Sequence, residues 1–261
     1  MRNNPHIYTT EETNWIINNY PIHGSKYCAE KMKLSIEQVR GKVSRMKLNK
    51  ADKINVEQFK NIKTKEVAYI MGFIWADGHV TKKTKCRIHV NIVKEDMEEI
   101  KNIFFETGKW NHHNRKYQYR EQGQIDIGSK SLHKIFCDYD YQHKSHISPF
   151  KIIESIPEKL KNYFFRGLSD GDGCFYINKK HYTYQYILSS THEQNWKYMI
   201  DLCEKLNIKY RIDRVINKKS KYSAFRICRK NDVIIFGNYI YNDFNFGLNR
   251  KHKKFLEIKN N

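Results

Sequence analysis

The segment over residues 70–78 reads IMGFIWADG, and the segment over residues 165–173 reads FRGLSDGDG. In both, small residues recur four positions apart: Gly72 and Ala76, then Gly167 and Gly171. Residues four apart share a helix face, and small side chains allow two helix backbones to approach closely. The two segments are therefore predicted to form helices that pack on each other.

Each segment ends in an aspartate followed by glycine, at Asp77 and Asp172. A glycine after a helix favours a left-handed helix end, so both aspartates are expected at the ends of the two packed helices. A carboxylate there faces the negative end of the helix dipole, at a cost of about 0.3 to 1 kcal/mol. The pair also repels itself and needs a cation, and hard oxygen ligands favour Mg²⁺ or Mn²⁺. A purely structural turn at each Asp-Gly pair is the alternative interpretation.

The chain repeats the same order of elements around the two segments, which begin 95 residues apart. At an offset of 100, Ile125 and Ile127 match Phe225 and Ile227. Residues 87–92 alternate between polar and apolar side chains, which is typical of a half-buried strand. These patterns predict an α+β fold that arose by internal duplication.

Residues 7–48 are predicted to form three short helices. Pro21 and Gly24 are expected to end the first, and Ser35 with Gln38 forms a capping box that begins the third. The polar side of the third helix is basic and contains the candidate DNA contacts Gln38, Lys42 and Arg45. Such a unit resembles the helix-turn-helix modules of the Myb-like kind, which place a helix in the DNA major groove. A small helical cap with a solvated basic face is the alternative.

Four regions are expected along the chain. Residues 1–48 form the helix-turn-helix-like module, and residues 49–65, which are polar and rich in lysine, form a linker. Residues 66–157 and 158–261 are the two duplicated halves, here called the first half and the second half.

Composition narrows the class of partner. The 261 residues include 48 Lys and Arg against 28 Asp and Glu, a formal charge of +20, which favours a polyanion such as nucleic acid. The absence of a long apolar run or a signal-peptide pattern argues against membrane insertion and secretion. The six cysteines form no C-x-x-C pair and are expected to be reduced thiols. We therefore expect an intracellular protein that is located with DNA.

The two segments resemble the motif of the LAGLIDADG homing endonucleases, and the resemblance covers residues 66–261 in the manner of a single-chain member with two motifs. Residue 75 is a departure, since Trp75 replaces the first aspartate of the motif. The resemblance implies a pseudo-twofold pair of αββαββα units that form a DNA-binding saddle. It also implies that Asp77 and Asp172 bind Mg²⁺ or Mn²⁺, with each aspartate serving one DNA strand. Whether the backbone at Ala76 also takes part in metal binding is not determined by the resemblance.

The family also has a lysine late in each half, near the catalytic metal. Lys144 and Lys251 occupy the matching places and are the predicted catalytic lysines, although an ordinary solvated lysine is the alternative for either. Polar side chains on alternating strand positions would contact DNA. The candidates are Arg87, His89, Asn91, Arg115, Gln118, Arg120, Tyr184, Arg211, Arg214, Arg226 and Arg229.

The leading functional hypothesis is a site-specific, metal-dependent endonuclease for double-stranded DNA. Because one chain supplies two half-sites, it is expected to act as a monomer on a long, non-palindromic target. A non-cleaving DNA-binding regulator and an intron RNA maturase on the same scaffold are the alternatives. The two aspartates argue against the regulator, and the sequence does not separate cleavage from maturase activity.

Overall fold

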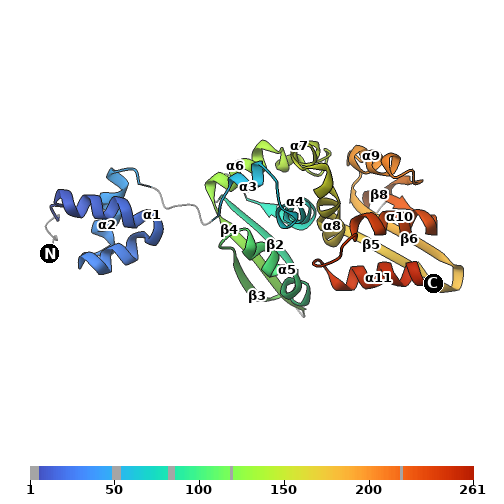
Figure 1. Ribbon diagram of the computed structural model, residues 1–261, viewed down its shortest axis with the longest axis horizontal. Helices are drawn as coiled ribbons and strands as arrows, with labels where there is room; N and C mark the ends of the chain where they lie inside the picture. Colours follow the sequence, from blue (N-terminus) through green and yellow to red (C-terminus); the bar gives the residue numbers. More distant parts are fainter. Residues whose placement is uncertain (1–5, 49–53, 82–85, 118–119, 218–219) are drawn as a thin grey trace. The chain divides into compact units, whose positions relative to one another are not determined.

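The computed structural model describes residues 6–48, 54–81, 86–117, 120–217 and 220–261, with only the backbone of 115–117 and 120. The chain divides into two compact units, Met1–Asp52 and Lys53–Asn261 (Figure 1). Each unit has its own hydrophobic core. In the part of the chain so described, no helix combines the length and apolar character needed to cross a membrane.

The N-terminal unit consists of α1 (Thr10–Met32) and α2 (Ile36–Arg45). The predicted end of the first helix is confirmed at Gly24, whose φ of 78° a glycine adopts without strain, whereas Pro21 lies inside the helix and does not end it. The capping box of Ser35 and Gln38 is confirmed. The core of this unit consists of Ile16, Cys28, Ala29, Val39 and Val43.

The second unit begins earlier than the sequence predicted. Ile54, Phe59 and Ile62 are buried in its core, and Phe59 lies in α3 (Glu57–Lys60). Residues 54–65 are therefore structured parts of this unit and not a linker. The lysines and polar residues between these apolar side chains are what made the segment look like a linker.

Two copies of an αββαββα unit follow. The first consists of α4 (Lys65–Asp77), β1 (Gly78–Val80), β2 (Arg87–Val93), α5 (Lys94–Glu106), β3 (Asn111–Tyr117), β4 (Arg120–Gly128) and α6 (Lys130–Asp138). The second consists of α8 (Lys161–Asp172), β5 (Gly173–Asn178), β6 (Thr183–Thr191), α9 (Lys197–Lys205), β7 (Arg211–Ile216), β8 (Lys221–Ile227) and α10 (Lys230–Ile240). A short α7 (Phe150–Ser155) connects the copies, and α11 (Asn249–Asn260) ends the chain.

The two copies have the same topology. Their antiparallel sheets have strand orders β1-β2-β4-β3 and β5-β6-β8-β7. Even the register agrees, because Val90 pairs with Gly78 and Ile125, whereas Leu188 pairs with Gly173 and Phe225 at the corresponding places. The predicted α+β fold with an internal duplication is confirmed.

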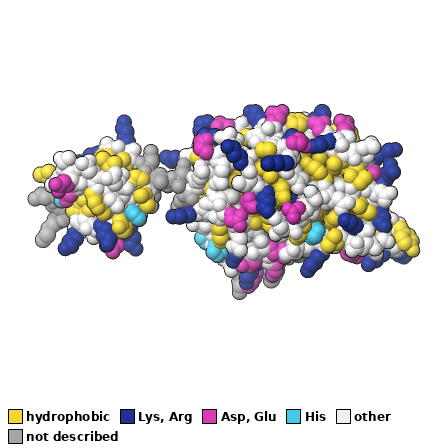
Figure 2. All heavy atoms as spheres, in the orientation of Figure 1, with side chains coloured by type: hydrophobic (Ala, Val, Ile, Leu, Met, Phe, Trp, Pro, Cys, Tyr) yellow, Lys and Arg dark blue, Asp and Glu magenta, His cyan; other side chains and the backbone are white. Residues whose placement is uncertain are grey.

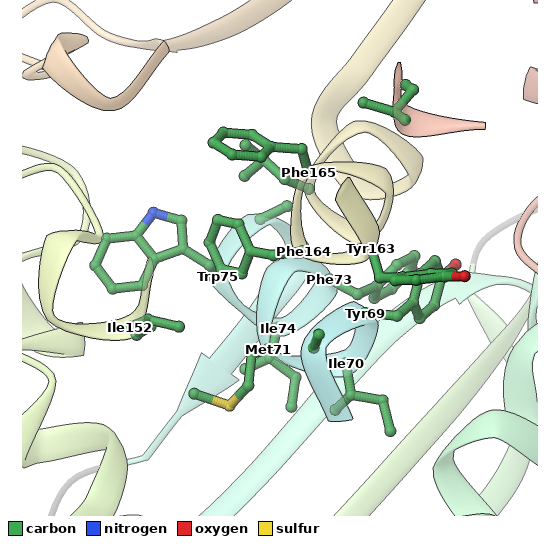
Figure 3. Packing of buried hydrophobic residues seen from close by; sticks show 14 of the residues in the cluster. Tyr69, Ile70, Met71, Phe73, Ile74, Trp75, Ile152, Tyr163, Phe164 and Phe165 are labelled. Atoms are coloured by element: carbon green, nitrogen blue, oxygen red, sulfur yellow. The ribbon is translucent and has the colours of Figure 1, made fainter. Parts of the chain in front are cut away.

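Helices α4 and α8 lie side by side between the two sheets (Figure 1). A Cβ atom placed on Gly72 would lie 1.9 Å from the carbonyl oxygen of Phe164, and one on Gly167 would lie 2.0 Å from that of Tyr69. The helices thus touch backbone to backbone, as the spacing of small residues predicted. Aromatic side chains such as Phe73 surround this contact (Figure 3).

Candidate active site

The C-terminal ends of α4 and α8 bring Asp77 and Asp172 together. Burial, followed by the charge of Asp77, raises the pKa of Asp172 to about 6. Burial also raises the pKa of Asp77, although the nearby Lys251 and Lys144 oppose it. The contact between the two carboxyl groups lowers the pKa of Asp77 and raises that of Asp172. The two predicted metal ligands therefore form one acidic pair whose side chains remain accessible to solvent.

Lys144 lies at the end of α4. Its Nζ atom donates hydrogen bonds to the carbonyl oxygens of Ala76 at 2.7 Å and Gly78 at 2.9 Å, and to the hydroxyl of Tyr141 at 2.9 Å. A cation at a helix C-terminus is favourable because it faces the negative end of the dipole. Burial nevertheless lowers the pKa of Lys144, while the charges of Asp172 and Asp77 raise it.

Lys251 occupies the equivalent place at the end of α8. Its Nζ atom donates to the carbonyl oxygens of Ser169 at 2.9 Å, Asp170 at 2.5 Å and Gly171 at 3.0 Å. The side chain is buried, and burial lowers its pKa. The structure thus brings both predicted lysines to the aspartate pair, where each donates to carbonyl oxygens at the end of a motif helix.

The glycines after the aspartates adopt a different conformation from the one predicted. Gly78 has φ −72° and Gly173 has φ −76°, both extended and not left-handed, because a strand starts directly after each helix. Glycine is required at both positions because a side chain would collide with neighbouring atoms. A Cβ atom on Gly78 would lie 2.3 Å from the carbonyl oxygen of Ile74. On Gly173 it would lie 2.7 Å from the Tyr186 hydroxyl.

The donor set suits a hard divalent cation. Among the described residues, no three His, Cys, Asp or Glu side chains gather into a metal site. Mg²⁺, however, keeps several waters and commonly takes one or two protein carboxylates together with phosphate oxygens. Two neighbouring carboxyl groups that remain accessible to solvent match that requirement.

A polar pocket of about 50 Å³ lies beside Asp172. Its walls include Lys144, Ser189, Ser190 and Gln194. The sequence analysis did not identify Gln194, which lies in the segment between β6 and α9 and follows no local motif. It also missed Tyr141, whose hydroxyl donates to the carbonyl oxygens of Ile74 and Gly78. Its position three residues before Lys144 is the one signal that the sequence contains.

The strand register assigns the candidate DNA contacts to sheet faces. In both sheets one face carries the buried apolar side chains, and the other is called the outer face here. On the outer face of the first sheet lie Arg87, His89 and Asn91. Arg87 forms an ion pair of 2.7 Å with the buried Asp126, which neutralises much of its charge within the protein.

In the second sheet the candidates divide between the two faces. Arg211 and Arg226 lie on the outer face, where Arg226 donates to Asp213 at 2.7 Å. The register places Tyr184 opposite Ile177 and Arg214 opposite the buried Ser223. These two residues therefore belong to the face with the core and not to the outer face. Arg229 is outside the strands and lies at the N-cap of α10.

Other candidates have local partners or lie outside the described residues. Gln38 accepts a hydrogen bond from the backbone amide of Ser35 at 2.8 Å, so capping uses its side-chain oxygen. Lys42 lies over the ring of Tyr8, and Arg45 is exposed. Gln118 lies outside the described residues, as do the side chains of Arg115 and Arg120. On the face seen in Figure 2, basic side chains are interspersed with acidic and apolar ones, so the positive charge is not gathered there.

Residues 159–241 match the family model described as LAGLIDADG-like domain. The solved homing endonuclease I-WcaI bound to its DNA recognition sequence is 18% identical, with a TM-score of 0.53 over 77% of this chain and 91% of that chain. The LAGLIDADG meganuclease I-AabMI bound to uncleaved DNA is 15% identical, with a TM-score of 0.48 over 74% and 88%. Full-length DUF199/WhiA from Thermatoga maritima is 16% identical, with a TM-score of 0.48 over 78% and 64%.

No curated protein matches the chain. The family model covers the second motif, which keeps both aspartates, and not the first, which has Trp75. The matching strand orders extend the same architecture to the first half. The chain therefore has the fold of the LAGLIDADG homing endonucleases and contains a LAGLIDADG-like domain at residues 159–241.

Proposed function

We propose that the chain is a metal-dependent, site-specific endonuclease that cuts both strands of DNA. The observation that carries this proposal is the close pair of Asp77 and Asp172, with a lysine at the end of each of their helices. In a scaffold that only bound DNA, two neighbouring carboxylates at this point would be unfavourable, because they repel each other and the phosphates.

Asp77 and Asp172 are the residues that would hold Mg²⁺ or Mn²⁺. When bound, such a metal activates a water and stabilises the leaving oxygen in phosphodiester hydrolysis. Lys144 and Lys251 supply positive charge beside the carboxylates and fix the ends of α4 and α8.

Double-stranded DNA is the proposed substrate. The net charge of +20 favours a polyanion, and the I-WcaI structure of similar fold is bound to its DNA recognition sequence. The two sheets present different outer-face side chains, which suits a long, non-palindromic target read by one chain. Residues 1–48 would add a separate DNA contact through α2, whose exposed side chains include Arg40 and Arg45.

The decisive experiment incubates the purified protein with a randomised DNA library and Mg²⁺, Mn²⁺ or Ca²⁺, and maps new double-strand ends by sequencing. We expect one family of ends that requires Mg²⁺ or Mn²⁺ and disappears in Asp77→Asn and Asp172→Asn. Specific binding without ends in any metal would instead identify a non-cleaving regulator. Binding to a structured intron RNA, with no effect on DNA, would identify a maturase.

A further inference from the structure

Each site lysine is flanked by residues that contact the opposite half of the molecule. Lys144 lies at the end of the first half and Lys251 near the end of the second, and each donates to the motif helix of its own half. Residues next to each lysine, however, also contact the opposite half. These contacts differ in kind between the two lysines.

Residues next to Lys251 are attached to the first half by a salt bridge. Arg250 donates from Nε to Oδ1 of Asp96 at 2.8 Å and from Nη2 to Oδ2 at 2.6 Å. The backbone amide of Asn249 donates to Glu99 at 2.8 Å. Both acids lie on α5 of the first half, and the Asp96 side chain is only 7% exposed. A two-point guanidinium–carboxylate contact fixes orientation as well as distance, so it fixes the residue next to Lys251.

The segment with Lys144 is held by neutral hydrogen bonds. The Ser148 hydroxyl donates to the carbonyl oxygen of Asn195 at 2.9 Å, and Gln194 donates to that of Ile147 at 2.8 Å. The backbone amide of Asn195 donates to the carbonyl oxygen of His146 at 3.2 Å. These partners lie between β6 and α9 of the second half. The two lysines therefore depend on different contacts, which can be removed separately.

We propose that the Asp96–Arg250 pair positions Lys251, so that hydrolysis of one DNA strand depends on it, and that the Ser148–Asn195 contact positions Lys144 for the other strand. This inference rests on the proposed endonuclease function. Asp96, Arg250 and Ser148 are positioning residues, since each acts through a lysine. The consequence is that the rates at the two strands can be changed one at a time.

The test measures both strands of one target, labelled at different ends, in single turnovers with saturating protein. Lys251→Met and Lys144→Met first identify the strand that each lysine serves. We expect Asp96→Asn to slow the Lys251 strand about tenfold relative to the other, a loss on the order expected when a reacting group is displaced by less than 1 Å. Ser148→Ala is the matched variant and should slow the Lys144 strand instead.

Arg250→Gln provides a second route to the same contact, because Arg250 is more than half exposed and its loss should leave the fold intact. It should give the strand bias of Asp96→Asn, and the double variant should add little to either single one. Equal slowing of both strands by Asp96→Asn would overturn the proposal. Weaker DNA affinity in Arg250→Gln alone, with normal strand rates in Asp96→Asn, would also overturn it and make Arg250 a DNA contact.

A second readout needs no cleavage. Competitive acetylation with acetic anhydride, quantified for each lysine by mass spectrometry, measures how accessible the amines of the half-buried Lys144 and the buried Lys251 are. We expect Asp96→Asn to increase the acetylation rate of Lys251 several-fold and to leave the acetylation rate of Lys144 unchanged. Ser148→Ala should have the reverse effect. Unchanged rates in both variants would contradict the positioning roles. A protein that cuts neither strand but shows these changes would refute the endonuclease function and keep the positioning.

Discussion

The carboxylate of Asp170 accepts a hydrogen bond of 2.9 Å from the backbone amide of Leu248, just before the segment with Lys251. It also accepts from the hydroxyls of Tyr69 at 2.9 Å and Tyr241 at 3.1 Å. The first motif has Trp75 at this position, and its ring packs edge-on against Tyr141. Figure 3 shows the Trp75 side chain directed toward Ile152 of α7. An apolar contact in the first half thus replaces a polar anchor in the second.

The first prediction concerns this anchor. Asp170→Ala should lower the free energy of unfolding by at least about 3 kcal/mol, because buried donors without an acceptor cost about 1–3 kcal/mol each. Urea denaturation followed by circular dichroism measures this loss. Asp172→Asn is the control from the same motif and should unfold no more easily than the wild type. A loss below about 1 kcal/mol for Asp170→Ala would show that water replaces the carboxylate.

The second prediction concerns the acidic pair. Asp77→Asn or Asp172→Asn should abolish double-strand cleavage, leave at most nicking, and keep DNA affinity. Because burial and mutual repulsion raise the pKa of Asp172 to about 6, its ionised form destabilises the fold at pH 7. The asparagine variant should therefore have a melting temperature at or above that of the wild type. Full double-strand cleavage by either variant would disprove the assignment.

The third prediction concerns the contact between α4 and α8. Gly167→Ala should destabilise the fold by about 1–3 kcal/mol, as overpacking does, because the new methyl meets the Tyr69 carbonyl. Gly167→Leu should cost more. Gly128→Ala is the control, since a Cβ atom there has no neighbour within 4 Å among the described residues. Thermal unfolding of the three variants decides the matter, and a Gly167→Leu protein of unaltered stability would contradict the arrangement.

The fourth prediction concerns the N-terminal unit. A protein that begins at residue 53 should fold and cleave, but with weaker DNA affinity, a shorter footprint and a smaller dependence of affinity on salt. A start near residue 62 should fail, because it removes the buried Ile54 and Phe59. Footprinting and titration at several salt concentrations test both. An unchanged footprint would assign residues 1–52 to another partner.

The fifth prediction concerns the oligomeric state. Two motif helices and two aspartates in one chain complete the site, so a single chain should bind each target. Analytical ultracentrifugation of the protein–DNA complex, with a duplex that contains one target, should give one chain per duplex. Two chains on a palindromic duplex would contradict this stoichiometry.

The sequence predicted the paired helices well because their signal is local. Gly72 and Gly167 lie at a spacing that has meaning within one helix. The linker prediction failed over residues 54–65 because Phe59 becomes buried only against distant helices. In the same way, the conformation of Gly78 depends on the strand that follows it, and the sequence pattern of a helix end does not contain that information.

The site residues that lie in the repeated motif could be predicted from the sequence. The contacts between residues far apart in the sequence could not. Asp77 and Asp172 follow from the duplicated segments, and the lysines from their equivalent places late in each half. The contact of Asp170 with Leu248 and that of Asp96 with Arg250 join residues 78 and 154 positions apart. No periodicity in the sequence connects residues so far apart.

The backbone contact between α4 and α8 has a consequence for how such a protein can change its target. Since main-chain atoms set the distance between the helices, no substitution on the outer faces of the sheets alters the spacing of Asp77 and Asp172. In the proposed endonuclease, substitutions on the strands would therefore change the DNA sequence that is recognised while the stagger between the two cuts stays constant. Proteins with this architecture could therefore acquire new DNA targets while the proposed catalytic geometry stays the same.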